Sequence, residues 1–363
     1  MMSRARIRRY LLRAEGTTHA LIASRRLKWK IRKIRKQIDP QGIAAAEADE
    51  SFTRAARRFL ASHFPRDGAL DWHLAYAAAN GNRQAEYIPE SVFYQRIEPA
   101  INPRIAASMY ADKNHYDLLF SGIPLPATLG RTIEGKPYAH DYTPISSGEL
   151  LEEVRRAGCD AIAKPSVDTG GGRNVRVLSR QELGELTPER FVGFLGENTI
   201  VQQLLQQHPA LAEFHPASLN TLRIVTFRSP GGFVVLSSVL RMGVNRAQVD
   251  NQAAGGISCG IDADGRLKTV AYDKYFKRHS QHPTTGRPFE GFAIPGYAEA
   301  CRMCLESHQR LPLFGMISWD VGIDSEGSPV LIEANLEWQE INFHQLNNGP
   351  LFGPHTREVL RMM

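Results

Sequence analysis

Cysteine is scarce in this sequence and long apolar runs are missing, and each absence excludes a class of protein. Four cysteines in 363 residues do not make a disulfide framework, which agrees with a reducing compartment. No apolar run approaches the roughly eighteen residues of a membrane span, and arginines break the short apolar stretches near the N-terminus, so no secretory signal is evident. We therefore expect a globular, cytoplasmic protein with two or three hydrophobic cores.

Acidic residues are nearly absent from residues 1–40, which form a basic arm. Thirteen Lys and Arg stand there against Glu15 and Asp39, although the net charge of the whole chain is only +6. The stretch RRLKWKIRKIRKQI sets apolar side chains among cations, as in a basic helix that lies on an anionic membrane or binds nucleic acid. A helix whose apolar stripe packs on its own protein explains the pattern equally well. Peripheral contact with the inner membrane face thus stays open, and nucleic acid is the less expected partner.

In the rest of the chain, the amino-acid pattern changes near residue 111 from one typical of helices to one typical of strands and turns. Residues 41–110 are alanine-rich and predicted to be mainly helical, whereas short β-branched runs between Gly, Pro and Asp-Gly turns follow, which is typical of α+β proteins. We predict a helix at about 297–309. The predicted strands are 161–164, 174–178, 199–203, 221–228, 233–242, 256–262, 267–272 and a hairpin within 315–335.

The hairpin SWDVGIDSEGSPVLIEANLEW carries the strongest chemical signal. A turn between Glu326 and Gly327 places Asp320 opposite Glu333 and Ser318 opposite Asn335. Opposed carboxylates destabilise a hairpin unless a positive charge lies between them, and their oxygens are the ligands that hard divalent cations prefer. We therefore predict a metal site formed by Asp320, Glu333 and Asn335. The other face should be buried in the core through Trp319, Val321, Ile323, Val330, Ile332 and Ala334.

A second signal is the stretch AIAKPSVDTGGGRNVRVL, which predicts a strand ending in Lys164, a glycine loop and another strand. Backbone N–H groups of such a loop can close over phosphate oxygens while the lysine supplies a positive charge. The loop is neither a Walker A motif nor GxGxxG, and a plain glycine-rich turn is the alternative. Nearby, TIVQQLLQQ offers an apolar strand against which a purine can lie, with Gln202 or Gln203 assisting.

Taken together, these motifs resemble the ATP-grasp enzymes, and within them the branch associated with sugar transfer and cell-surface polysaccharides, over roughly residues 111–350. The opening lysine motif of the family is similar to DKNHYDLLFSGIPLPAT, and its mobile phosphate loop is similar to TGGG. Two arginine strands of the family are similar to HPASLNTLRIVTF and to LRMGVNRAQVDNQAAGGISCGI, the second of which also contains Asn251. The resemblance implies two catalytic arginines, Arg223 and Arg241. It implies that ATP is held by Lys113, Lys164, Ser166, Thr169, Gly170, Gly171, Gly172, Gln202, Gln203, Leu204 and Asn220.

The implied reaction is carboxylate–amine ligation. ATP would phosphorylate a carboxylate, and an amine would attack the acyl phosphate, with Mg²⁺ or Mn²⁺ bridging the phosphates. The implied substrates are small-molecule or glycan-linked carboxylates and amines of polysaccharide, sugar-derived or secondary-metabolite chemistry. Two alternatives are a phosphotransferase on the same fold and a nucleotide-sensing module that binds a membrane or nucleic acid through its basic arm.

The implied layout has four parts: a basic arm (1–40), a helical region (41–110), a lid subdomain (111–204) and a subdomain with the metal site (205–363). One departure concerns the ribose, because no acidic residue lies between Gln202 and Ala212, where many members of the family have one. A second pattern needs a choice of interpretation. Cys301, Cys304 and His308 share one face of the predicted helix, as in part of a zinc site, but no second CxxC exists, so buried core cysteines are the favoured interpretation.

Overall fold

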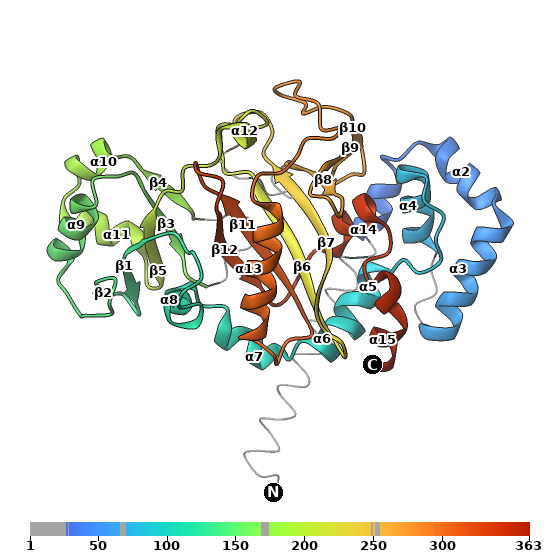
Figure 1. The fold of residues 1–363 in the computed structure, drawn as a ribbon, viewed down its shortest axis with the longest axis horizontal. Helices are drawn as coiled ribbons and strands as arrows, with labels where there is room; N and C mark the ends of the chain where they lie inside the picture. The colour runs from blue at the N-terminus through green and yellow to red at the C-terminus, as the bar shows by residue number, and fades with distance from the viewer. Residues whose placement is uncertain (1–26, 28, 66–69, 168–173, 248–249, 251–254) are drawn as a thin grey trace, which may run out of the picture. The chain divides into compact units, whose positions relative to one another are not determined.

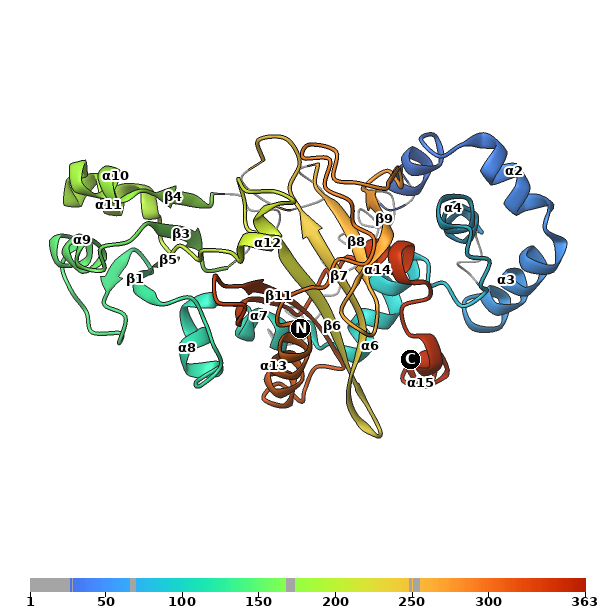
Figure 2. The ribbon, with the colours of Figure 1, turned by 45° about the horizontal axis from the view of Figure 1, so that its top comes forward.

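The computed structural model describes residues 27, 29–65, 70–167, 174–247, 250 and 255–363. These residues form two compact units, drawn in Figures 1 and 2. The first unit comprises the described residues up to Ile101 together with Lys274–Arg278 and Glu340–Met363. The second unit comprises Asn102–Asp273 and His279–Gln339. The predicted α+β class, with a helical N-terminal region, is confirmed.

Helices dominate the first unit, and local capping explains where two of them begin. The Asp39 carboxylate accepts the N–H groups of Gln41 and Gly42, and the Asp49 carboxylate accepts that of Phe52, which satisfies donors that a helix start leaves free. The helices are α2 (Pro40–Ala48), α3 (Glu50–His63), α4 (Asp71–Asn80), α5 (Glu90–Val92), α6 (Glu98–Ile101), α14 (Ile341–Asn348) and α15 (Thr356–Arg361). A π-helical turn, Phe93–Ile97, lies between α5 and α6.

The described part of the basic arm packs within this unit. Residues 29–35 are helical, and Ile31, Ile34 and Ile38 are buried. The Lys30 ammonium lies 2.6 Å from the buried Glu90 carboxylate. Of the two alternatives for this stretch, the burial of these isoleucines agrees with packing on the protein itself, although Trp29 is exposed. Residues 1–26 and 28, where the rest of the arm lies, are outside the described residues.

The second unit holds two antiparallel sheets, of which the smaller has five strands in the order β2-β1-β5-β3-β4. Its helices pack on the sheet through Leu150, Leu151, Leu183 and Phe191, which join the core formed with β3, β4 and β5. The strands are β1 (Thr128–Ile133), β2 (Lys136–Tyr138), β3 (Ala161–Pro165), β4 (Arg176–Leu178) and β5 (Thr199–Gln203), and the helices are α9 (Ser147–Arg156), α10 (Arg180–Glu185) and α11 (Pro188–Leu195).

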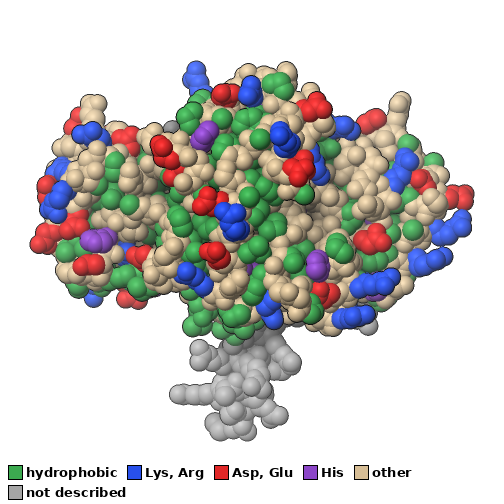
Figure 3. All heavy atoms as spheres, in the orientation of Figure 1, with side chains coloured by type: hydrophobic (Ala, Val, Ile, Leu, Met, Phe, Trp, Pro, Cys, Tyr) green, Lys and Arg blue, Asp and Glu red, His purple; other side chains and the backbone are tan. Residues whose placement is uncertain are grey.

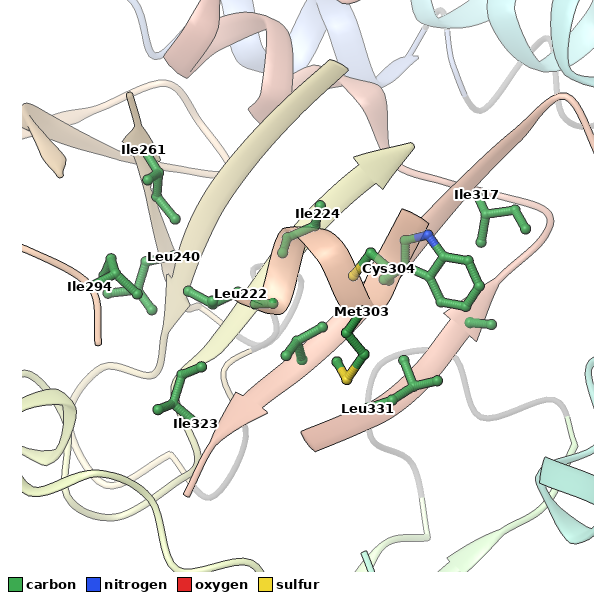
Figure 4. Packing of buried hydrophobic residues seen from close by; sticks show 14 of the residues in the cluster. Leu222, Ile224, Leu240, Ile261, Ile294, Met303, Cys304, Ile317, Ile323 and Leu331 are labelled. Atoms are coloured by element: carbon green, nitrogen blue, oxygen red, sulfur yellow. The ribbon is translucent and has the colours of Figure 1, made fainter. Parts of the chain in front are cut away.

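The larger sheet has seven strands in the order β10-β9-β8-β7-β6-β11-β12. Helix α13 (Tyr297–Gln309) lies across β6 and β11 in Figure 1, and Figure 4 shows its Met303 and Cys304 beside Ile224 and Leu331 of the sheet. The strands are β6 (Thr221–Ser229), β7 (Gly232–Met242), β8 (Ile257–Ile261), β9 (Leu267–Asp273), β10 (Arg278–His279), β11 (Met316–Ile323) and β12 (Pro329–Asn335), and the short helices of the unit are α7 (Arg104–Tyr110), α8 (Tyr116–Leu119) and α12 (Pro209–Ala212).

The β11–β12 hairpin has the predicted register at its functional end, where Asp320 pairs with Glu333 and Ser318 with Asn335. The predicted core face is partly wrong, because the register shifts by one residue between Asp320 and Val321. A bulge of this kind reverses the alternation of side chains beyond it. Leu331 therefore enters the main core, and Ile332 is only half-buried.

The cysteine and histidine pattern on α13 is structural. His308 is fully buried, and its two ring nitrogens lie 2.7 Å from the Thr226 hydroxyl and 3.0 Å from the Phe314 carbonyl oxygen. The Phe314 carbonyl can only accept, so Nε2–H donates to it, and Nδ1 of the neutral ring accepts the proton of the Thr226 hydroxyl. The Trp319 indole N–H donates to the same hydroxyl. Both ring nitrogens are thus engaged, which supports the interpretation of Cys301 and Cys304 as core cysteines rather than zinc ligands.

The burial of His308 predicts acid sensitivity. Burial lowers the pKa of His308 from 6.5 to about 4, against the opposing effect of the Phe314 carbonyl. Between these two values the unfolded chain binds a proton that the folded chain does not, so the free energy of unfolding falls as the pH falls through this window. We expect this residue to cost about 2 kcal/mol between pH 6.5 and 5.

Urea unfolding of His308→Gln and of the exposed-residue control His140→Gln, each at pH 7 and pH 5, measures this effect. His308→Gln should lose less stability on acidification than the control. Equal pH dependence in the two variants would contradict the assignment of a neutral, buried His308.

In the part of the chain that the structure describes, no helix is long and apolar enough to cross a membrane. Figure 3 shows Lys and Arg side chains interspersed with Asp and Glu over the face that it draws. Charges of one sign therefore do not dominate that face.

Candidate active site

The candidate site is built on three neighbouring strands of the larger sheet. Asp320 of β11 pairs with Arg223 of β6 on one side and with Glu333 of β12 on the other. Directly paired residues of antiparallel strands project from the same face, so one cation and two carboxylates form a row across the sheet. Arg241 of β7 pairs with Thr221, two residues before Arg223, and it projects from this face as well.

Two arginines hold the Asp320 carboxylate. Arg223 donates through both Nε and Nη2, with Nη2 2.9 Å from Oδ2, and Arg241 donates from Nη1 over 3.1 Å to Oδ1. All three side chains are buried. Burial raises the pKa of Asp320, but the charges of Arg223 and then Arg241 outweigh this effect and hold it below its ordinary value. Asp320 is therefore a carboxylate that stays charged inside the protein.

A lysine balances the Glu333 carboxylate. Lys113 Nζ lies 2.6 Å from Glu333 Oε1, and the lysine side chain is buried. Lys113 begins a short 3₁₀ turn, Lys113–His115, whose start is capped by Asp112, and its backbone N–H donates to the Ser166 carbonyl just beyond β3. The positive charge that the opposed carboxylates require thus comes from a segment more than two hundred residues earlier in the chain.

Lys164, in β3, is also buried. Burial lowers its pKa to about 8, the charge of Lys113 adds to the decrease, and Glu333 and Asp320 oppose it. Lys164 therefore lies within electrostatic reach of Lys113 and of both carboxylates. Lys113, Asp320 and Glu333 thus lie together although they are far apart in the sequence, and the charge of Lys164 acts on the same group.

The donor set suits a hard cation. Among the described residues, no three His, Cys, Asp or Glu side chains are grouped to hold a metal ion. The predicted site instead combines two carboxylates, Asp320 and Glu333, with one amide. The Asn335 amide lies beside them, donating over 3.1 Å to the Ser318 carbonyl and over 3.4 Å to Asp320. Carboxylate and amide oxygens are ligands of Mg²⁺. The oxygens of Asp320, Glu333 and Asn335 thus suit the predicted metal. Its binding requires that some of the ion pairs of Arg223, Arg241 and Lys113 with these carboxylates break.

Several predicted nucleotide ligands lie where an additional partner is needed. The buried Ser166 hydroxyl and the Gln202 Oε1 atom have no hydrogen-bond partner among the described residues. Buried polar atoms are normally paired, so such atoms indicate a ligand or water. Gln203 is exposed, and the N–H of the half-buried Leu204 donates to Asp160. Thr169, Gly170, Gly171, Gly172 and Asn251 lie outside the described residues.

The Asn220 Oδ1 atom, like the Ser166 hydroxyl and Gln202 Oε1, has no hydrogen-bond partner among the described residues, but the protein itself holds the amide nitrogen of Asn220. Asn220 is fully buried, and its amide nitrogen lies within 2.9 Å of the Gln207 side chain and of the carbonyl oxygens of Leu211 and His215. These contacts brace the segment between β5 and β6. A direct contact of Asn220 with the nucleotide therefore remains a proposal.

Asp250 is a residue of the site that the sequence analysis missed. Its Oδ1 lies 3.1 Å from Arg241 Nη2, and its Oδ2 accepts the hydroxyl and the N–H of Thr221. Burial raises the pKa of Asp250, while Arg241 and the Thr221 hydrogen bond oppose the increase. The available signal was a carboxylate directly before Asn251 in the motif that carries Arg241.

Comparison of the sequence with family models identifies the larger part of this unit. Residues 191–360 match the model of the family described as sugar-transfer associated ATP-grasp. The resemblance predicted from the motifs is confirmed over these residues. No curated protein matches the chain.

Solved structures similar to the chain include three proteins. The first is the ATP-grasp ligase PsnB with its minimal precursor, Mg and ADP, at 16% identity and a TM-score of 0.41, covering 72% of this chain and 60% of PsnB. The D-cycloserine synthetase DcsG has 14% identity and a TM-score of 0.44, covering 71% of this chain and 72% of DcsG. The biotin carboxylase of Campylobacter jejuni has 13% identity and a TM-score of 0.44, covering 72% and 48%. The chain thus spans less than two thirds of the PsnB chain.

Proposed function

We propose that this protein is an ATP- and Mg²⁺-dependent carboxylate–amine ligase that forms an amide through an acyl phosphate. The observation that carries the proposal is the meeting of Lys113 and Lys164 with Asp320 and Glu333, beside Arg223 and Arg241. Two lysines suit the phosphates of a nucleotide, and two carboxylates suit the metal that accompanies it. The family match supports the nucleotide and the class of enzyme.

Each residue has a defined task in this reaction. Lys113 and Lys164 hold the α- and β-phosphates, and Ser166 with the glycine loop adds hydrogen bonds to them. Asp320, Glu333 and Asn335 hold the Mg²⁺ ion, which when bound neutralises phosphate charge and orients the γ-phosphate. Arg223 and Arg241 stabilise the charge that develops on the transferring phosphoryl group and on the tetrahedral species formed by the amine. Gln202, Gln203 and Leu204 line the position of the adenine.

The substrates follow from the family. We propose that the carboxylate and the amine are parts of cell-surface polysaccharides, sugar-derived molecules or secondary metabolites, because the matched family is associated with sugar transfer. A cytoplasmic location is part of the proposal. The four cysteines, all described and all free, support a reducing compartment.

Trapping with hydroxylamine tests the reaction. An acyl phosphate reacts with hydroxylamine to give a hydroxamate, whereas a phosphoryl group on a hydroxyl does not. We expect ATP- and Mg²⁺-dependent hydroxamate from one or more members of a panel of uronic acids, amino acids and hydroxy acids, with ADP and phosphate formed in equal amounts. Arg223→Ala should lower the yield at least about a hundredfold, as expected for loss of a transition-state charge contact.

Omission of ATP provides the chemical control, and Glu152→Gln on α9, which removes an exposed carboxylate, provides the protein control. A stable phosphorylated product without hydroxamate would instead identify a phosphotransferase on the same fold.

A further inference from the structure

Arg241 divides its guanidinium group between two carboxylates. Nη1 lies 3.1 Å from Asp320 Oδ1, and Nη2 lies 3.1 Å from Asp250 Oδ1. Arg223, in contrast, binds Asp320 through both Nε and Nη2. The side chains of Arg241 and Asp250 are only 6% and 12% exposed, so this pair is shielded from water, where such contacts are stronger than at a surface.

Asp250 is itself fixed by the neighbouring strand. One of its oxygens binds Arg241, and the other accepts both the hydroxyl and the backbone N–H of Thr221. Thr221 and Arg241 are paired across β6 and β7. Asp250 therefore binds both members of one cross-strand pair, and the Thr221 backbone gives it a fixed position from which to orient the guanidinium group.

The two carboxylates on Arg241 have different fates when the site is filled. Asp320 is a proposed metal ligand, and a divalent cation on its oxygens weakens their attraction for the arginines. Asp250 is not among the proposed metal ligands, so its bond to Arg241 persists. An arginine side chain has many rotamers, and ordering it when a ligand binds costs conformational entropy. A partner that already fixes the rotamer removes this cost when the guanidinium group contacts a phosphoryl group.

We propose that Asp250 is a positioning residue that keeps Arg241 directed at the γ-phosphate while Asp320 is engaged by the metal. The inference rests on the proposed function, and it adds a residue outside the predicted set. Thr221 contributes to this positioning, because its hydroxyl and backbone N–H donate hydrogen bonds to the second oxygen of Asp250.

Binding of two nucleotides, without any acceptor, tests the inference. Calorimetric titration of Mg²⁺·AMPPNP and Mg²⁺·ADP gives the ratio of the two affinities, which reports contact with the γ-phosphate. Arg241→Ala and Asp250→Asn should each lower this ratio about tenfold, the usual effect of losing a charge-assisted hydrogen bond. The double variant should show no further decrease, because Asp250 acts through Arg241. Glu152→Gln serves as the control for carboxylate removal.

Each outcome distinguishes the inference from the proposed function. Failure of the wild-type protein to bind either nucleotide overturns the proposed function. An unchanged ratio in Asp250→Asn or in Arg241→Ala, with binding intact, overturns the inference alone. An equal loss of affinity for both nucleotides in Asp250→Asn overturns it too, because a general weakening of the site does not discriminate the γ-phosphate. Additive effects in the double variant show that Asp250 acts independently of Arg241, which also overturns it.

Discussion

Mg²⁺-dependent binding of an ATP analogue should disappear when either Glu333 or Lys164 is replaced by alanine. Glu333 is a proposed ligand of the metal, and Lys164 is a buried ammonium group at the proposed phosphate site. Loss of either group leaves the charges of the metal and the phosphates without one of their partners, which typically costs 2–5 kcal/mol or about 30-fold to several thousandfold in affinity. Calorimetric titration with AMPPNP, with and without Mg²⁺, measures both effects.

The two substitutions should differ in their metal dependence. Glu333→Ala should abolish the difference between titrations with and without Mg²⁺, whereas Lys164→Ala should weaken binding in both. The Glu152→Gln variant should bind as the wild type does. If Glu333→Ala retains full Mg²⁺-dependent binding, the opposed carboxylates of the hairpin are not a metal site and the ligase proposal loses its basis.

Asp320→Ala should destabilise the folded protein by about 3–5 kcal/mol, because it leaves buried cations without their carboxylate. Arg223 and Arg241 both donate to Asp320, and all three residues are buried in the sheet. Urea unfolding at pH 7 measures the change. Asp320→Asn should also be destabilising, since it removes the charge while keeping the shape.

Replacing Arg223 by methionine in the Asp320→Ala background should restore part of the lost stability, because an apolar side chain carries no unpaired charge. Glu152→Gln should change the free energy of unfolding by less than about 0.5 kcal/mol, the usual range for exposed positions. Equal stability of Asp320→Ala and the wild type would show that the arginines have an adequate alternative partner.

The parts of the fold that local patterns determine could be predicted from the sequence. Helix 297–309 and strand 199–203 have the predicted bounds, and the opposition of Asp320 and Glu333 followed from the position of the turn. Strand β1 was not predicted, because Gly130 and Arg131 interrupt the β-branched and apolar residues of Thr128–Ile133. The bulge near Ile332 was not predicted either, since no residue of that strand marks it.

The sequence indicates residues of the candidate site where polar groups are concentrated in short motifs, and it does not indicate those that depend on distant contacts. The carboxylates, Lys164 and the glycine loop were visible in single stretches. The ion pair between Lys113 and Glu333 joins segments that no local pattern connects, and the role of Asp250 depends on how Thr221 and Arg241 pair across two strands. In the same way, Lys274–Arg278 and Glu340–Met363 join the N-terminal helices through contacts that the sequence pattern does not announce.

The charges in the row across β6, β11 and β12 are balanced by the protein's own residues. Asp320 forms ion pairs with Arg223 and Arg241, and Glu333 forms one with Lys113, so each carboxylate of this row already has a positively charged partner. Under the proposed function we therefore expect a nucleotide and its metal to bind by exchange, with the cation replacing the basic side chains at the carboxylates and the phosphates replacing the carboxylates at the ammonium and guanidinium groups. Either ligand alone would break an ion pair without supplying both replacements, so we expect the two ligands to bind cooperatively.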